Sequence, residues 1–71
     1  MASELTVQEI KDRLRLRREE LGFTRNTVAN KADMPDGYLT KLERGEHKPK
    51  RVTLERLALV LDCSVEWLID G

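Results

Sequence analysis

Residues 23–45, which decide the fold, read FTRNTVANKADMPDGYLTKLERG. Thr24 is placed to begin a short helix, because a threonine hydroxyl can accept a hydrogen bond from the free backbone N–H groups of a helix's first turn. Val28, Ala29 and Ala32 follow at helical spacing and form the inward face of that helix. Because alanine side chains are small, this face predicts a close crossing with a second helix.

A break follows at Pro35, since proline cannot occupy a helix interior and disfavours helix at the residue before it. A second short helix is therefore predicted to begin at about Pro35 or Asp36 and to end at Arg44-Gly45. Its inward residues are Leu39 and Leu42. Two short helices joined by a tight turn, with a polar outer face on the second, are typical of the helix-turn-helix that places its second helix in the major groove of DNA.

Helical patterns continue on both sides of this stretch. Upstream, Thr6 and Glu9 form a capping-box pattern that predicts a helix from Thr6 to about Leu21. Downstream, a polar loop precedes a fourth helix, and Ser64 is placed to cap a last short helix that ends at about Ile69. The inward residues of the first and fourth helices are Ile10, Leu14, Leu21, Val52, Leu54, Leu57, Ala58 and Leu61. With no strand-type alternation, the chain is predicted to be all-α, a compact five-helix bundle.

Length and composition exclude several classes of protein. The 71 residues predict one domain over residues 1–71, with residues 1–5 as a flexible tail. No apolar run approaches the ~20 residues of a membrane span, and no secretory signal pattern is present, so we expect a cytoplasmic protein. One histidine, His47, and one cysteine, Cys63, are too few for a zinc site. We therefore predict no enzyme activity, metal, cofactor or small-molecule ligand.

The charge is zero overall but unevenly distributed. Residues 21–51 contain seven basic and four acidic side chains, whereas residues 52–71 contain one basic and four acidic side chains. A molecule polarised in this way can offer a basic face to phosphates and an acidic face to a partner or to solvent.

Residues 23–45 resemble the helix-turn-helix of the phage repressor and Cro family, often called XRE-like. The resemblance rests on Thr24, Ala29, Leu39 and the run Leu42-Glu43-Arg44-Gly45, and it extends through Pro49 to the ending Ser64-Val65-Glu66-Trp67-Leu68. It implies a lambda-repressor-like fold whose third helix reads DNA. It further implies a prokaryotic or phage-encoded transcriptional regulator that binds double-stranded DNA sequence-specifically, acting as a homodimeric repressor on a palindromic operator.

The resemblance also implies which residues face DNA. The candidates for reading bases are Asp36, Gly37, Thr40 and Lys41, and the candidates for contacting phosphates are Arg25, Tyr38, Arg44, Lys48 and Lys50. Lys41 can donate to guanine, Thr40 can bond a base edge or contact a thymine methyl group, and Asp36 can accept from cytosine. For Tyr38, the alternative is a half-buried aromatic that covers the core.

The chain departs from the family pattern at three places. Asp33 stands where relatives have glycine in the turn, although aspartate tolerates the left-handed conformation better than most residues. The reading helix starts with Pro35-Asp36-Gly37 in place of polar donors, which predicts fewer direct base contacts and more dependence on phosphates and DNA shape. In the first helix, Arg17 stands at an apolar family position and Leu16 lies beside it, either simply exposed or part of a contact surface.

Several features leave alternatives open. Arg18 matches a family arginine that braces the fold, and Cys63 is expected to fill a small core site. At the C-terminus, Leu68 is expected in the core and Trp67 and Ile69 at a dimer interface, unless all three close the core. The alternative function is a protein-interaction module, antitoxin-like or adaptor, that retains the helix-turn-helix fold.

Overall fold

The computed structural model describes residues 8–71, and those residues form helices joined by turns and loops, without a strand. The predictions of a flexible tail at residues 1–5 and of a helix start at Thr6 lie outside the described residues. The helices are α1 (Gln8–Glu20), α2 (Arg25–Lys31), α3 (Tyr38–Glu43), α4 (Arg51–Leu61) and α5 (Val65–Asp70). The predicted all-α, five-helix architecture is confirmed.

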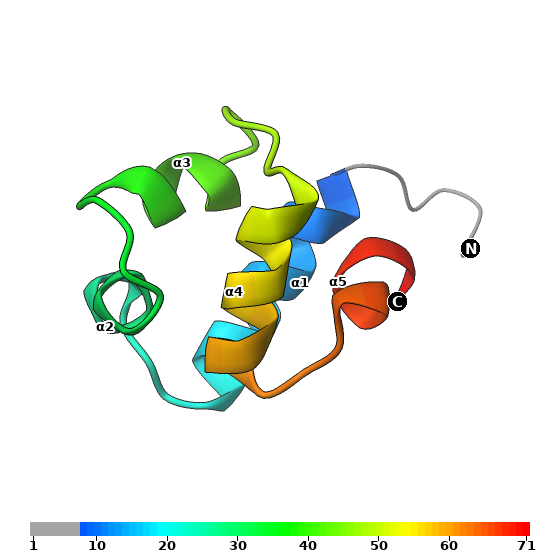
Figure 1. Ribbon diagram of the computed structural model, residues 1–71, viewed down its shortest axis with the longest axis horizontal. Coiled ribbons are helices and arrows are strands. Elements are labelled where there is room, and N and C mark those ends of the chain that lie inside the picture. The colour runs from blue at the N-terminus through cyan, green and yellow to red at the C-terminus, as the bar shows by residue number, and fades with distance from the viewer. Residues whose placement is uncertain (1–7) are drawn as a thin grey trace.

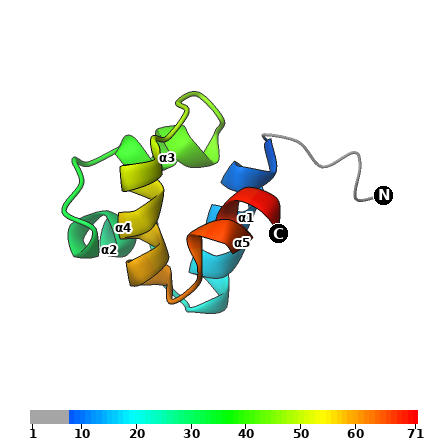
Figure 2. The same cartoon turned by 45° about the vertical axis from the view of Figure 1, so that its right-hand side comes forward.

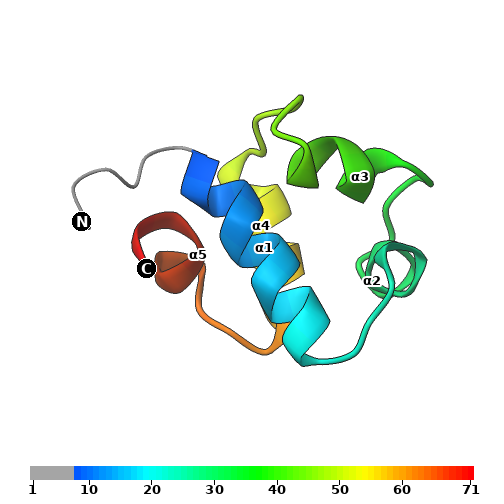
Figure 3. The ribbon, with the colours of Figure 1, turned by 180° about the vertical axis from the view of Figure 1, so that it is seen from behind.

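The helices are arranged around one apolar core. Figures 1 and 3 show α2 and α3 together at one end of the molecule and α5 at the other. Figure 2 shows α5 beside α1, and α5 also packs against α4. The core consists of Leu14, Val28, Ala32, Leu39, Leu42, Leu54, Leu57, Ala58, Leu61 and Leu68. Every helix supplies at least one of these residues, so the helix-turn-helix cannot separate from the rest without exposing the core.

Side-chain caps fix the starts of two helices. The Thr24 hydroxyl accepts a hydrogen bond from the Thr27 N–H at 3.1 Å, and the Ser64 hydroxyl accepts one from the Trp67 N–H at 3.0 Å. Each bond satisfies a backbone donor that the first turn of a helix leaves without an intrahelical acceptor. Both predicted caps are confirmed.

The predicted start of α3 is wrong by two to three residues. The helix begins at Tyr38, because Gly37 has a φ of 83° in the left-handed region and cannot belong to a right-handed helix. The Tyr38 N–H instead donates to the Pro35 carbonyl at 3.2 Å, which makes the residues between them a turn. Asp36 and Gly37 therefore precede the helix on which they were expected to lie.

In the turn between α2 and α3, Asp33 adopts the left-handed conformation that was expected of it. Asp33 has a φ of 58°, and the Met34 N–H behind it donates to the Ala29 carbonyl at 2.8 Å. Many helices end at a residue in the left-handed conformation, after which a backbone N–H donates to a carbonyl in the last turn of the helix. Asp33 thus fills the turn position at which the resemblance implied glycine.

One of the apolar residues of α4 that were predicted to face inward is exposed. Leu54, Leu57, Ala58 and Leu61 are buried as predicted, but 57% of Val52 is exposed. Val52 lies in the first turn of α4, on the side away from the core, and Leu59, two turns later on that side, is 84% exposed. Leu16 is also exposed. Within residues 8–71, no helix has the length and apolar character needed to cross a bilayer.

Candidate nucleic-acid interface

Helix α3 has one buried face and one exposed face. Leu39 and Leu42 point into the core, whereas Lys41 and Arg44 are exposed and Thr40 is half-buried. Lys41 and Arg44 are three residues apart, so they lie next to each other on the helix surface. The outer face of α3 and its C-cap therefore present two cations and one hydroxyl.

The other two base-reading candidates extend this face at its N-terminal end. Asp36 and Gly37 are both exposed, and the Gly37 carbonyl accepts a hydrogen bond from the Lys41 N–H at 3.1 Å. A Cβ added at Gly37 would meet no atom within 4 Å. The structure thus brings Asp36, Gly37, Thr40 and Lys41 together, with the first two in the turn before α3.

Tyr38 links α3 to the loop that follows it. Its side chain is half-buried and packs edge-to-face on the His47 ring, with a centroid distance of 5.1 Å and an interplanar angle of 68°. This geometry is favourable for two aromatic rings. This contact was not predictable from the sequence, because it joins residues on different elements.

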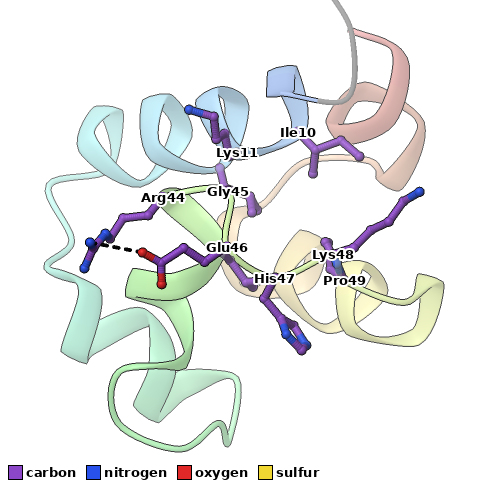
Figure 4. Close-up of a pocket in the computed structure, with 10 residues that line it drawn as sticks. Ile10, Lys11, Arg44, Gly45, Glu46, His47, Lys48 and Pro49 are labelled. Carbon is purple, nitrogen blue, oxygen red and sulfur yellow. Dashed lines mark ion pairs between the residues drawn. The ribbon is translucent and has the colours of Figure 1, made fainter.

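The loop between α3 and α4 carries further phosphate candidates. Lys48 and Lys50 are exposed, and Arg44 forms an ion pair with Glu46 at 3.0 Å. Figure 4 shows the Arg44 and Lys48 side chains leaving this region in opposite directions. The cations at the end of α3 and in this loop are therefore spread along the surface and are not gathered at one point.

A pocket of about 460 Å³ lies between this loop and α1. Its lining residues are Ile10, Lys11, Leu14, Leu42, Arg44, Gly45, Glu46, His47, Lys48 and Pro49. Gly45 has a φ of 77°, and a Cβ at this position would lie 3.0 Å from Lys11 Cδ. The glycine is therefore needed for the left-handed turn, whereas the flexible Lys11 side chain could move away from an added Cβ.

A buried carboxylate joins the helix-turn-helix to α1. Glu43 Oε2 accepts a hydrogen bond from Arg18 Nε at 2.7 Å, and Glu43 Oε1 accepts one from Arg18 Nη2 at 3.1 Å. Both residues are only 8% exposed, and the hydrogen bond to Glu43 raises the pKa of Arg18 although burial opposes it. Arg18 Nη1 also donates to the Phe23 carbonyl at 2.9 Å. Arg18 thus braces the fold, as its match to the family arginine implied.

Glu43 also binds Arg25, the phosphate candidate of α2. Arg25 Nε donates to Glu43 Oε1 at 3.0 Å, and the Arg25 side chain is 46% exposed. Sequence reasoning did not identify Glu43 as a functional residue. The available signal was its place in the run Leu42-Glu43-Arg44-Gly45, together with the bracing arginine at position 18.

The dimer candidates lie at the other end of the molecule. Leu68 is fully buried, as predicted, while Trp67 and Ile69 are half-buried and pack against the core. Arg13 Nη1 donates to the carbonyls of Leu68 and Ile69 at 3.0 and 3.1 Å, which ties α5 to α1. The apolar side chains that remain partly accessible are therefore held on a fixed helix.

Arg17 has a structural role at its unusual position. Its Nε donates to the Leu61 carbonyl at 2.8 Å, and its Nη2 donates to the Asp62 carbonyl at 3.1 Å. These are carbonyls at the C-terminal end of α4, where a cation is favourable. A polar capping contact thus occupies the position at which the resemblance implied an apolar side chain.

Comparison with known proteins identifies the family. A helix-turn-helix family model matches residues 14–68. The chain is 36% identical over 62 residues to the HTH-type transcriptional regulator SinR of Bacillus subtilis (strain 168), covering 86% of this chain and 56% of SinR. It is 32% identical over 62 residues to the HTH-type transcriptional regulator DicA of Escherichia coli (strain K12), covering 87% of this chain and 46% of DicA. The chain thus spans about half the length of these relatives.

A solved structure matches the fold closely. It is the crystal structure of SinR, the master regulator for biofilm formation, in complex with DNA, with a TM-score of 0.79 and 35% sequence identity. The match covers 83% of this chain and 95% of that chain. Because the family model spans most of the sequence and the relatives are transcriptional regulators and not enzymes, the chain belongs to the XRE (phage repressor and Cro) family of helix-turn-helix proteins.

Proposed function

We propose that the chain is a DNA-binding transcriptional regulator that places α3 in the major groove of duplex DNA. The observation that carries the proposal is the two-sided α3, whose leucines are buried while Lys41 faces solvent. The similarity to SinR, which was crystallised in complex with DNA, supports DNA binding by this chain. In this fold class the second helix of the motif enters the groove with its N-terminal residues toward the bases.

The contacts divide into those that read bases and those that position the protein. Lys41 donates to guanine, Thr40 contacts a base edge or a thymine methyl group, and Asp36 accepts from cytosine. Gly37 supplies only backbone to this surface. The residues assigned to phosphates are Arg25, Tyr38, Arg44, Lys48 and Lys50, which bind without reading sequence.

The active form is proposed to be a homodimer on a palindromic operator, acting in the cytoplasm as a repressor. Trp67 and Ile69 on α5 are the interface candidates, because they are apolar and only half-buried in the monomer. A two-fold pair of chains places its two α3 helices on half-sites about one DNA turn, roughly 34 Å, apart. Occupation of the operator then blocks transcription.

Selection of duplexes from a random pool tests this function most directly, because the selected sequence reports specificity, symmetry and half-site spacing together. Affinity for the selected duplex is then measured by fluorescence anisotropy at several salt concentrations. We expect a palindrome and a steep loss of affinity with salt, since each neutralised phosphate contributes about −0.9 to the slope of log K against log salt. Absence of binding at about 50 mM salt would refute DNA binding.

A protein-interaction module remains the second candidate, and one observation favours it. Leu59 and Val52 are exposed on the same side of α4, in the part of the chain with four acids and one base. An exposed apolar stripe of this kind can dock a partner protein. Leu59→Ser separates the two functions. If the chain is a DNA-binding protein, this variant keeps the wild-type affinity for the selected duplex, because Leu59 lies outside the proposed DNA-binding surface.

A further inference from the structure

Glu43 is buried and yet binds an arginine on the proposed DNA-binding surface. We infer that Glu43 is a positioning residue for DNA binding: it holds Arg25 by Nε so that the terminal amino groups of Arg25 clamp one phosphate. The inference rests on the proposed function and deepens it. Arg25 then contacts the phosphate as a fork, that is, with the Nη donors of a guanidinium group held in a fixed orientation, and not as a mobile charge.

The Glu43 carboxylate is shared between two arginines. Arg18 already takes one hydrogen bond to each oxygen of the Glu43 carboxylate, at 2.7 and 3.1 Å. Arg25 adds a third bond, at 3.0 Å, to an oxygen that Arg18 also uses. Arg18 is also within 3.9 Å of Glu19 through Nη2 and is buried, so its guanidinium group is fully engaged inside the protein. Arg25 is the exposed partner of Glu43 and therefore the one that can meet a phosphate.

The shape of arginine suits this double role. A guanidinium group carries five N–H donors in a rigid plane, and Nε uses only one of them. The bond from Nε to Glu43 is the one that the structure gives Arg25 within the described residues, so four donors on the two Nη atoms stay available. With 46% of the side chain exposed, these donors are accessible to a phosphate.

The contact also fixes Arg25 relative to α3. Arg25 begins α2, whereas Glu43 is the last residue of α3 and is anchored to α1 through Arg18. A phosphate held by Arg25 is therefore held at a set distance from Lys41, which lies two residues before Glu43. Pre-ordering of this kind increases affinity, because less side-chain freedom is lost on binding.

Two substitutions at Arg25 separate a fork from a point charge. Arg25→Gln removes the charge, and Arg25→Lys keeps it but cannot bond Glu43 and a phosphate in one plane. For the selected duplex we expect Arg25→Gln to lower affinity at least about fivefold. For Arg25→Gln, the slope of log K against log salt should also become shallower by about 0.9. We expect Arg25→Lys to bind as weakly as Arg25→Gln, within about twofold, because the fork is lost in both.

Arg15→Gln is the matched control, because Arg15 is exposed on α1, pairs with Glu19 and lies outside the proposed interface. It removes the same charge and should leave affinity and salt slope unchanged. Wild-type affinity for Arg25→Lys would overturn the inference, since a point charge would then suffice. An effect of Arg15→Gln equal to that of Arg25→Gln would overturn it as well.

Glu43→Gln provides an independent measurement through a double-mutant cycle with Arg25→Gln. Binding is measured at a temperature where thermal melting shows every variant folded. We expect Glu43→Gln to weaken binding in the wild-type background and to have no effect in the Arg25→Gln background. Additive losses would overturn the inference. If Glu43→Gln does not fold, the comparison of Arg25→Lys with Arg25→Gln decides alone.

Failure of the inference and failure of the proposed function give different results. A wild type that binds no duplex overturns both. A wild type that binds its duplex, together with full activity of Arg25→Lys or an additive cycle, overturns the role of Glu43 alone.

Discussion

Two lysines of equal charge have different positions relative to the proposed groove. Lys41 lies on the exposed face of α3, whereas Lys48 lies in the loop after it. We predict that Lys41→Ala relaxes base preference at one position of the site, at a cost of about 1–3 kcal/mol on the preferred duplex. Lys48→Ala should weaken binding to all duplexes equally, and the slope of log K against log salt should become shallower by about 0.9.

Anisotropy titrations of both variants against the selected duplex and against a scrambled duplex check this prediction. The ratio of the two affinities should fall for Lys41→Ala and stay constant for Lys48→Ala. An unchanged ratio for Lys41→Ala would remove that side chain from base reading.

Cys63 gives a prediction that does not depend on DNA. Burial raises the pKa of the Cys63 thiol, with Arg17 opposing and Asp62 adding to the effect. The reactive species of a cysteine is the thiolate, so a raised pKa lowers its fraction at neutral pH. We expect the rate of alkylation by iodoacetamide to inflect at a higher pH in the folded protein than in the urea-unfolded chain. Equal inflections would contradict the assigned burial effect.

The same shift affects stability at alkaline pH. The folded-state pKa of Cys63 lies above its unfolded value, so the folded state holds the proton more tightly. The associated stability is complete below the unfolded pKa and is lost as the pH rises through the folded one. We therefore expect the free energy of unfolding of Cys63→Ser to fall less than that of the wild type as the pH rises through that alkaline range.

Single residues were predictable from the sequence where their role is local. The Thr24 and Ser64 caps depend on backbone N–H groups three residues away, and both were found. Glu43 was missed because its burial depends on Arg18 and Arg25, which lie 25 and 18 residues away along the chain. An acid in a helix is usually exposed, and only the assembled fold supplies the two cations that make its burial favourable.

At the scale of elements, the existence of each helix was predictable and some boundaries were not. Apolar spacing placed α2, α4 and α5 correctly, since tertiary packing uses the same periodicity. The start of α3 was assigned too early because proline is common in the first turn of helices. At this turn Gly37 adopts the left-handed conformation and delays the helix, which the residue type permits but does not require.

The turn between α2 and α3 contains a strained residue that can be relieved. Asp33 has a φ of 58°, a conformation that glycine adopts without a steric penalty. We predict that Asp33→Gly stabilises the protein by about 0.5–1 kcal/mol, the gain being limited by the larger entropy of glycine in the unfolded chain. Urea denaturation followed by circular dichroism measures the change.

Asp36→Gly is the matched control for this prediction. Asp36 is exposed in the same turn but does not have a positive φ. Glycine there brings only its entropic cost, so stability should fall slightly. A loss of stability in Asp33→Gly as large as that in Asp36→Gly would mean that the left-handed aspartate carries no strain.

At the scale of the whole molecule, the reading helix and the dimer candidates lie at opposite ends. Figure 1 shows α3 at one end and α5 at the other, with α4 between them. If two chains associate through α5, their α3 helices point away from the dyad, as separated half-sites require. The zero net charge fits this arrangement, because the basic third of the sequence forms one end and the acidic third contains α5.

Association through α5 makes Trp67 the side chain with the largest expected effect. Buried aromatic residues dominate protein interfaces, and truncation of such a residue commonly costs about 2 kcal/mol or more. We predict that Trp67→Ala shifts the monomer–dimer constant toward monomer by at least about tenfold in sedimentation equilibrium. Ile69→Ser should act in the same direction and keeps the test valid if Trp67→Ala is too unstable.

Leu59→Ala is the matched control, because Leu59 is the more exposed apolar side chain but lies on α4. It should leave the monomer–dimer constant unchanged. The two dimer variants should also bind a single half-site like the wild type while losing affinity for the full palindrome, since only the palindrome benefits from two linked α3 helices. An unchanged constant for both α5 variants, or a shift caused by Leu59→Ala, would move the interface from α5 to the outer face of α4.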